Sequence, residues 1–180
     1  RFSEKGYLIP KPLIDVSSKP MLVNAIIDLP KTKRQKFIFR ENMSKLKLIT
    51  THLKRILPNS DIQLLKNNTK GQAVTCLLGM HDIDQNKPLI ISACDNGLIY
   101  DDKNLKELLI DKSIDILVWG CRSYPGAIRT PNMYGWIEEE NKIIKRIHVK
   151  KTYKDKYNDP IITGTFYFKK SAIFKKVAED

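Results

Sequence analysis

The sequence predicts an α/β fold in which helices alternate with short strands around a mostly parallel central sheet. Segments with apolar residues at helical spacing are separated by short apolar runs, and this alternation is typical of βαβ crossovers. Two runs, at residues 87–94 and 115–120, are almost continuously apolar. Such runs are expected for central strands that are covered on both faces.

The first predicted helix starts at Pro20, because proline is favoured in the first turn, and it covers residues 21–29. Ser44 is a favoured N-cap residue for a second helix, whose apolar side chains share one face until Pro58 closes it. Two further helices are predicted, at residues 71–80 and 105–109.

The predicted strands fall into two groups. The earlier strands are expected at residues 36–40, 61–66, 87–94 and 115–120. After Gly120 the segments become longer and more polar, and strands are expected at residues 134–138, 143–150 and 161–169. This second group predicts a mixed-sheet extension. Because no repeat or low-complexity linker separates the groups, a single domain over residues 1–180 is expected.

Length and composition exclude several classes of protein. A chain of 180 residues with 42% hydrophobic content can bury one substantial core, and its apolar runs are too short to span a bilayer. The three cysteines are far apart and have no spacing typical of zinc ligands. A reduced, cytoplasmic setting is therefore expected. No membrane partner is expected, because the apolar runs are short.

The net charge of +12 raises the alternative of a nucleic-acid partner. The basic residues are spread along the chain, with modest clusters at residues 31–36 and 142–156, and aromatic residues are not interleaved with them. A surface that stacks bases requires such aromatic residues. No nucleic acid is therefore expected as a partner.

The first residues place two cations where they could hold a polyphosphate from two sides. Arg1 is followed ten residues later by Lys11, which lies between Pro10 and Pro12. Lys19 then precedes the proline that opens the first predicted helix. This arrangement indicates nucleotide chemistry.

Asp95 directly follows the apolar run at residues 87–94 and precedes Asn96 and Gly97. Its carboxylate is expected beyond the carboxyl end of a strand, where ligands of open α/β sheets bind. Mg²⁺ is commonly held by one or two carboxylates together with substrate phosphates. Asp-Asn-Gly also suits a simple turn, and the position alone leaves both interpretations open.

Together these motifs resemble those of the sugar-1-phosphate nucleotidyltransferase family, especially its branch in bacterial capsule and lipopolysaccharide pathways. The resemblance implies the family's Rossmann-like fold, that of the nucleotide-diphospho-sugar transferases. It implies that Arg1 ends the glycine-rich loop, that Lys11 is the lysine of the Pro-Lys motif, and that Asp95 binds the catalytic Mg²⁺. The family's first strand and loop glycines do not occur before Arg1. The domain is therefore expected to be incomplete at its N-terminus, and its C-terminal limit stays open.

The resemblance extends to the nucleotide base and to the acceptor. Gly71, Gln72 and Ala73 match the Gly-x-Ala segment, whose backbone approaches the base because glycine allows it to come close. The residues that would contact the sugar are Tyr134, Gly135, Gly164 and Thr165. Lys150 would grip the acceptor phosphate, with Lys151 as the alternative, and Val149 stands where hexose-phosphate members have glutamate.

The function implied by the resemblance is an Mg²⁺-dependent transfer of a nucleotide to a sugar 1-phosphate, with release of pyrophosphate, for surface polysaccharide synthesis. Its catalytic residues would be Arg1, Lys11 and Lys150. The alternatives are a phosphorylated non-sugar acceptor, or a catalytically silent module that binds a nucleotide sugar or nucleic acid. A homo-oligomer is compatible with each of these.

Overall fold

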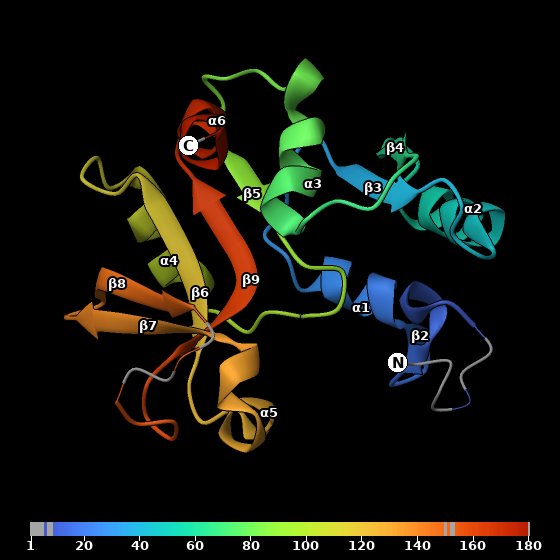
Figure 1. Cartoon of the computed structure of the whole chain (residues 1–180). Coiled ribbons are helices and arrows are strands. Elements are labelled where there is room, and N and C mark those ends of the chain that lie inside the picture. The colour runs from blue at the N-terminus through green and yellow to red at the C-terminus, as the bar shows by residue number, and fades with distance from the viewer. Residues whose placement is uncertain (1–5, 7–8, 150, 152–153, 180) are drawn as a thin grey trace. The chain divides into compact units, whose positions relative to one another are not determined.

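The computed structural model describes residues 6, 9–149, 151 and 154–179 (Figure 1). The chain divides into two compact units. The first comprises Arg1–Leu89, Ala93–Asp115 and Phe168–Asp180, and the second comprises Ile90–Ser92 and Ile116–Tyr167. That residues 1–180 behave as one domain stays a prediction.

The first unit contains most of the helices. Its α-helices are α1 (Met21–Ile27), α2 (Leu46–Ile56), α3 (Gln72–Leu78), α4 (Asp102–Ile110) and α6 (Ser171–Glu179). Single 3₁₀ turns occur at η2 (Lys11–Leu13) and η3 (Met80–Asp82). Its strands are β1 (Asp15–Val16), β2 (Lys19–Pro20), β3 (Lys36–Arg40) and β4 (Asp61–Leu65).

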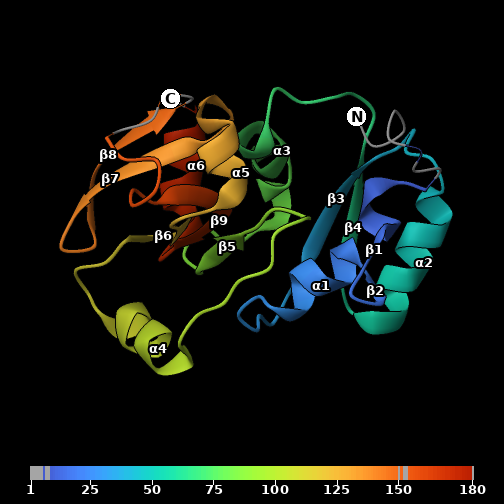
Figure 2. The same ribbon diagram turned by 90° about the horizontal axis from the view of Figure 1, so that it is seen from below.

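The core of the first unit lies where α1 and α2 pack against β3 (Figure 2). Ile49 and Leu53 are four residues apart on α2 and fully buried, and they meet Leu22 of α1 and Phe39 of β3. This spacing places apolar side chains on one helix face. β3 and β4 pair in parallel, whereas β1 and β2 form a small antiparallel hairpin.

Ion pairs tie β3 and β4 to η3. Arg34 donates from Nε to Asp61 Oδ2 over 2.6 Å, and both Arg34 and Lys36 bind the carboxylate of Asp82. Lys36 also donates to the carbonyl of Gly79. The hydrogen bonds from Lys36 and Arg34 hold the pKa of Asp82 well below its usual range. Charge pairing therefore fixes this edge of the first unit.

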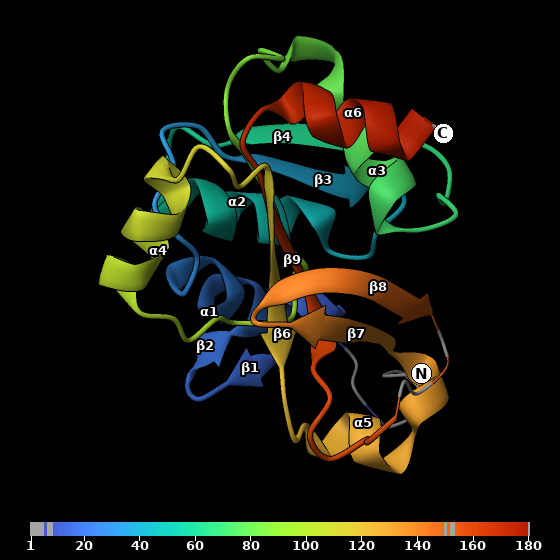
Figure 3. The ribbon, with the colours of Figure 1, turned by 90° about the vertical axis from the view of Figure 1, so that its left-hand side faces the viewer.

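The second unit is built around a five-stranded sheet. Its strands are β5 (Leu89–Ile91), β6 (Ile116–Cys121), β7 (Gly135–Glu140), β8 (Ile143–Val149) and β9 (Ile161–Phe168). The order is β5-β9-β7-β8, and β6 also pairs with β9. β7 is antiparallel to both β8 and β9, and Figure 3 shows the β7–β8 hairpin. Helix α5 (Pro125–Arg129) and a 3₁₀ turn, η4 (Pro131–Met133), precede β7.

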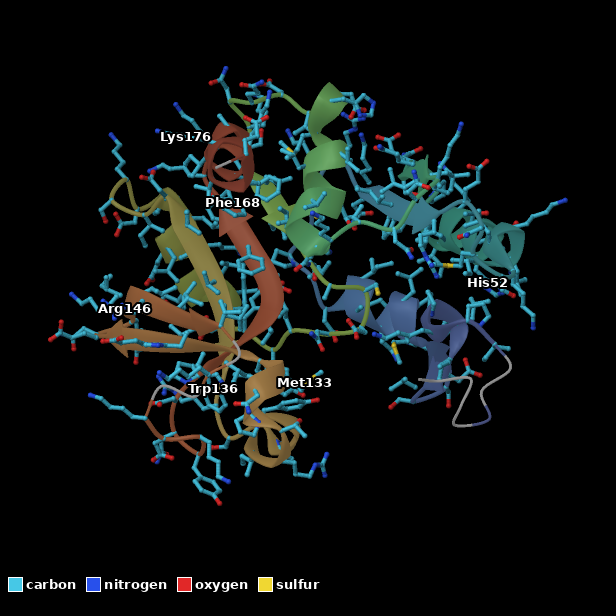
Figure 4. All side chains as sticks on the ribbon, in the orientation of Figure 1. His52, Met133, Trp136, Arg146, Phe168 and Lys176 are labelled. Carbon is cyan, nitrogen blue, oxygen red and sulfur yellow. The ribbon has the colours of Figure 1, made fainter. Side chains whose placement is uncertain are left out.

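Trp136 is the central core residue of the second unit (Figure 4). Its side chain is 1% exposed and packs with Ala127 and Ile161. The indole Nε1 donates to the carbonyl of Pro131 over 2.9 Å. This satisfies the one polar atom of the indole, as is usual for a buried tryptophan.

The predicted α/β character is confirmed, but the described residues form three separate sheets rather than one mostly parallel sheet. β3 and β4 form a parallel pair of their own. The antiparallel pairing of β7 and β8 follows from the two-residue turn between them, since parallel neighbours need a long crossover. None of the helices in the described part of the chain has the length and apolar content needed to cross a membrane.

Several predicted boundaries were wrong. Lys45, with a φ of 56°, is the N-cap of α2, and no side-chain hydrogen bond caps this helix. Ser44 therefore does not have the predicted capping role. The run at residues 87–94 is regular strand only over β5, so Asp95 lies in a loop several residues beyond it. Helices α5 and α6 are additional to the predicted elements.

Candidate functional site

Lys11 and Asp95 form an ion pair in the first unit. Lys11 Nζ donates to Asp95 Oδ2, although the residues are 84 positions apart in the sequence. The two side chains are 35% and 33% exposed, so the pair is open to solvent. The structure thus brings together the predicted triphosphate lysine and the predicted metal carboxylate.

Short, constrained backbone segments hold both partners of this pair. Lys11 begins η2, where Leu13 N donates to Pro10 O over 2.9 Å, and Pro12 of the same turn is buried. Gly97, two residues after Asp95, lies against α1: a Cβ at this position would be 2.4 Å from Asp28 Oδ2. A side chain at residue 97 would therefore require the Asp28 carboxylate to move.

The residues present fit a magnesium site of the kind that needs substrate phosphates. Asp95 already binds a cationic group, the ammonium of Lys11, and its carboxylate is accessible. Across the described ranges, no three His, Cys, Asp or Glu side chains gather as a metal site of their own. Mg²⁺ usually binds through one or two carboxylates and completes its coordination with phosphates and water. Asp95 is the residue that would hold it.

Gly71 has a backbone conformation that requires glycine. Its φ of 154° and ψ of −179° lie in a region that is essentially restricted to glycine. A Cβ would meet nothing within 4 Å, so the requirement comes from the backbone alone. Gly71 is the N-cap of α3, and Gln72 and Ala73 begin this helix with exposed side chains.

An open hollow of about 390 Å³ lies beside this segment. Its walls are the loop at residues 66–70 and the apolar side chains of Leu65, Val74 and Leu78. Arg40 NH1 donates to Asn68 Oδ1 over 2.9 Å and so anchors the loop to β3. The hollow combines an apolar wall with amide and lysine side chains, which suits a planar heterocycle that carries phosphate.

The predicted acceptor residues lie in the second unit and are mostly packed. Tyr134 makes an edge-to-face contact with Tyr124, with ring centroids 5.8 Å apart. Gly135 opens β7, where a Cβ would be 3.2 Å from Ile162 Cδ1. Gly164 has a φ of 88° within β9, a conformation that favours glycine.

Thr165 is fully buried, at 0% exposure. Its Oγ1 lies 3.0 Å from Ser92 Oγ, and this hydrogen bond joins β9 to the residue that follows β5. The Thr165 side chain is therefore not presented to a ligand in this structure. Its predicted contact with the substrate stays a prediction.

The predicted roles of Arg1 and Lys150 fall outside the described residues. The neighbours of Lys150 are described: Val149 ends β8 with 71% of its surface exposed, and Lys151 is also exposed. The choice between Lys150 and Lys151 thus stays a prediction.

The structure adds two features to the second unit that the motifs do not indicate. Gly126 leaves room for the tyrosine pair, because a Cβ there would be 2.6 Å from Tyr124 Cε1 and 2.7 Å from the Tyr134 hydroxyl. Arg122 NH2 donates to Glu139 Oε1 over 2.8 Å, and its NH1 binds the carbonyl of Asn158. The sequence signal is the Arg-Ser-Tyr-Pro-Gly segment that follows the apolar run at residues 115–120; this run was predicted to be covered on both faces, but β6 has no buried residue.

No protein-family profile matches the sequence. A search of curated proteins finds no significant match either.

Solved structures, in contrast, share the fold. A Bacillus anthracis protein assigned as a glucose-1-phosphate thymidylyltransferase has a TM-score of 0.66 at 17% identity, over 94% of this chain and 66% of that one. HddC from Yersinia pseudotuberculosis has a TM-score of 0.63 at 21% identity, over 93% and 70%. The inositol-1-phosphate CTP transferase from T. maritima has a TM-score of 0.67 at 12% identity, over 92% and 64%.

The chain thus spans about two thirds of the length of these structures. At such identities the likeness concerns the fold. The chain shares the nucleotide-diphospho-sugar transferase fold of these nucleotidyltransferases.

Proposed function

We propose that the protein is a nucleotidyltransferase that joins a nucleoside triphosphate to a sugar 1-phosphate, with release of pyrophosphate, and that it serves surface polysaccharide synthesis. The observation that carries this proposal is the pairing of Lys11 with Asp95. These residues come from distant segments, they were assigned separately to triphosphate and metal, and they meet within a fold shared with nucleotidyltransferases.

In the proposed reaction an oxygen of the acceptor phosphate attacks the α-phosphorus of the triphosphate. A new phosphorus–oxygen bond forms as the bond to the departing pyrophosphate breaks. Such transfers depend mainly on positioning and on neutralising oxygen charge, and Mg²⁺ when bound supplies part of that charge.

In this reaction Lys11 would hold the α-phosphate or the leaving group, and Asp95 would hold the metal. Arg1 would bind the β and γ phosphates, and Lys150 would bind the acceptor phosphate. Each contact places a positive charge where two anionic reactants would otherwise repel each other.

The nucleotide base would lie against the segment formed by Gly71, Gln72 and Ala73. The glycine-only backbone of Gly71 and the neighbouring hollow support this placement. No side chain at residue 71 would block the approach of a planar ring. The apolar wall of the hollow would remove one face of that ring from water.

A phosphorylated non-sugar acceptor is the second candidate. The apolar Val149 offers no hydrogen bond to a sugar hydroxyl, and it is 71% exposed beside the predicted acceptor lysine. One of the solved structures with this fold is an inositol-1-phosphate CTP transferase. Inositol 1-phosphate and related polyol phosphates therefore belong in the acceptor panel.

The test is pyrophosphate release from a panel of nucleoside triphosphates and phosphorylated acceptors in the presence of Mg²⁺. Asp95→Asn should lower kcat/KM by about a hundredfold or more, because a metal ligand loses its charge while core packing is unchanged. Asp102→Asn, on the exposed start of α4, is the matched control and should retain activity. Near-normal turnover of a folded Asp95→Asn variant would contradict the metal assignment.

A further inference from the structure

The Lys11–Asp95 ion pair joins two side chains for which the proposed function requires different partners. In that function Lys11 binds phosphate and Asp95 binds a divalent metal. In the structure the ammonium of Lys11 binds Asp95 Oδ2 directly. The ammonium of Lys11 thus lies where a metal bound to Asp95 would lie. The carboxylate of Asp95 lies where a phosphate bound to Lys11 would lie.

The geometry allows this pair to open without a rearrangement of the fold. The backbone at Lys11 is fixed by η2 and its two prolines, and the loop after Asp95 is packed at Gly97 against Asp28. The lysine side chain itself is flexible, with four carbons between the backbone and the ammonium. Both side chains are about one-third exposed. Rotation of the lysine side chain is therefore sufficient to separate the pair.

We propose that Lys11 is an internal counter-ion for Asp95, so that free metal and free triphosphate each bind weakly while metal-bound triphosphate binds well. This inference rests on the proposed function. In this inference the ion pair has a regulatory role, because it couples the binding of the metal to the binding of the triphosphate.

The coupling follows from charge. Free metal must compete with the ammonium for Asp95 and must also approach a positive charge. Free triphosphate must compete with the carboxylate for Lys11 and must also approach a negative charge. When both ligands are present, Lys11 turns to phosphate oxygens and Asp95 turns to the metal, so neither charge is left unpaired. By linkage, each ligand then strengthens the binding of the other by the same factor.

The first experiment measures binding of Mn²⁺ alone, without nucleotide, from the electron paramagnetic resonance signal of unbound Mn²⁺. Lys11→Met should tighten Mn²⁺ binding about two- to tenfold, the range expected for loss of a partly exposed ion pair and of a nearby like charge. Lys19→Met is the matched control, since Lys19 is exposed, also stands beside a proline, and makes no described bond to Asp95. Its Mn²⁺ affinity should equal that of the wild type.

The second experiment measures binding of inorganic tripolyphosphate in EDTA by calorimetry, which requires no knowledge of the base. Asp95→Asn should bind tripolyphosphate about two- to tenfold more tightly than the wild type, because the carboxylate that competes with phosphate for Lys11 has lost its charge. Asp102→Asn should match the wild type. Circular dichroism of each variant checks that the fold is intact.

The outcomes separate this inference from the proposed function. If Asp95→Asn abolishes Mn²⁺ binding while Lys11→Met binds no more tightly than the wild type, the counter-ion role is overturned and the metal site stands. If Mn²⁺ binding measured in the presence of tripolyphosphate is equal in the wild type and Asp95→Asn, the metal assignment itself fails. If tripolyphosphate binds Asp95→Asn no more tightly than the wild type, competition for Lys11 is overturned.

Discussion

The two units present their predicted functional residues in opposite ways. In the first unit Lys11 begins η2 and Asp95 lies in a loop; their side chains are about one-third exposed and pair with each other. In the second unit Thr165 is fully buried, and Gly135 is closely packed against Ile162. The comparison shows that the predicted site residues differ in exposure: Lys11 and Asp95 are accessible to solvent, whereas Thr165 is packed inside the sheet.

Each unit has its own buried core and its own ion pairs. In the first unit, ion pairs of Arg34 and Lys36 with Asp82 join β3 to η3. In the second unit, the buried Trp136 and the hydrogen bond of Thr165 fix the strands. Substitutions in the core should therefore reveal whether the units unfold separately.

The largest expected effect on stability is that of Trp136→Ala. Loss of a buried tryptophan costs about 3–5 kcal/mol, and the hydrogen bond to Pro131 is lost with it. Hydrogen exchange should show lost protection over residues 116–167. Leu53→Ala, expected to cost about 2–5 kcal/mol in the core of α2, is the counterpart in the first unit and should expose α1, α2 and β3 instead.

If either substitution reduces protection equally in both units, the two cores are not independently stable. The chain would then unfold as the single domain expected over residues 1–180. If each substitution reduces protection only in its own unit, the two cores are independently stable.

Local sequence patterns predicted those helices and strands that are determined by the spacing of neighbouring residues. The alternation at residues 36–40 matched β3, and Ile49 and Leu53 marked the buried face of α2. Pro-Gly at residues 125–126 is usually a turn signal, yet these residues begin α5. α6 begins two residues after the end of the strand predicted at residues 161–169, and no helix was predicted there.

The pairing of strands and of site residues has a non-local cause. No local sequence pattern predicts that β9 lies between β5 and β7, or that Thr165 contacts Ser92. Asp95 and Lys11 were placed in one site only through the order of motifs, since the contact spans 84 residues. Burial of Thr165 could not be read from a strand whose residues alternate little in polarity.

A smaller effect is expected at Gly71. Gly71→Ala should cost about 1–3 kcal/mol, because alanine cannot adopt a φ of 154° without strain. Urea unfolding of the first unit measures this cost. Gly97→Ala is the matched comparison: it creates a close contact with Asp28 rather than backbone strain. A Gly71→Ala variant as stable as the wild type would show that this loop adopts another conformation in solution.

The smallest expected effect, at Thr165, tests the contrast between the units most directly. Thr165→Val keeps the shape of the side chain and removes its hydroxyl, so it should cost about 1 kcal/mol through loss of the bond to Ser92. Because Thr165 is fully buried, the acceptor's KM should not change. Ser92→Ala should cost a similar amount, and the double variant should cost less than the sum of the two, because both remove the same bond. Urea unfolding and acceptor kinetics provide the two measurements. A tenfold rise in KM without loss of stability would show instead that the hydroxyl reaches the substrate, and the second unit would then present its motif residues to the ligand as the first unit does.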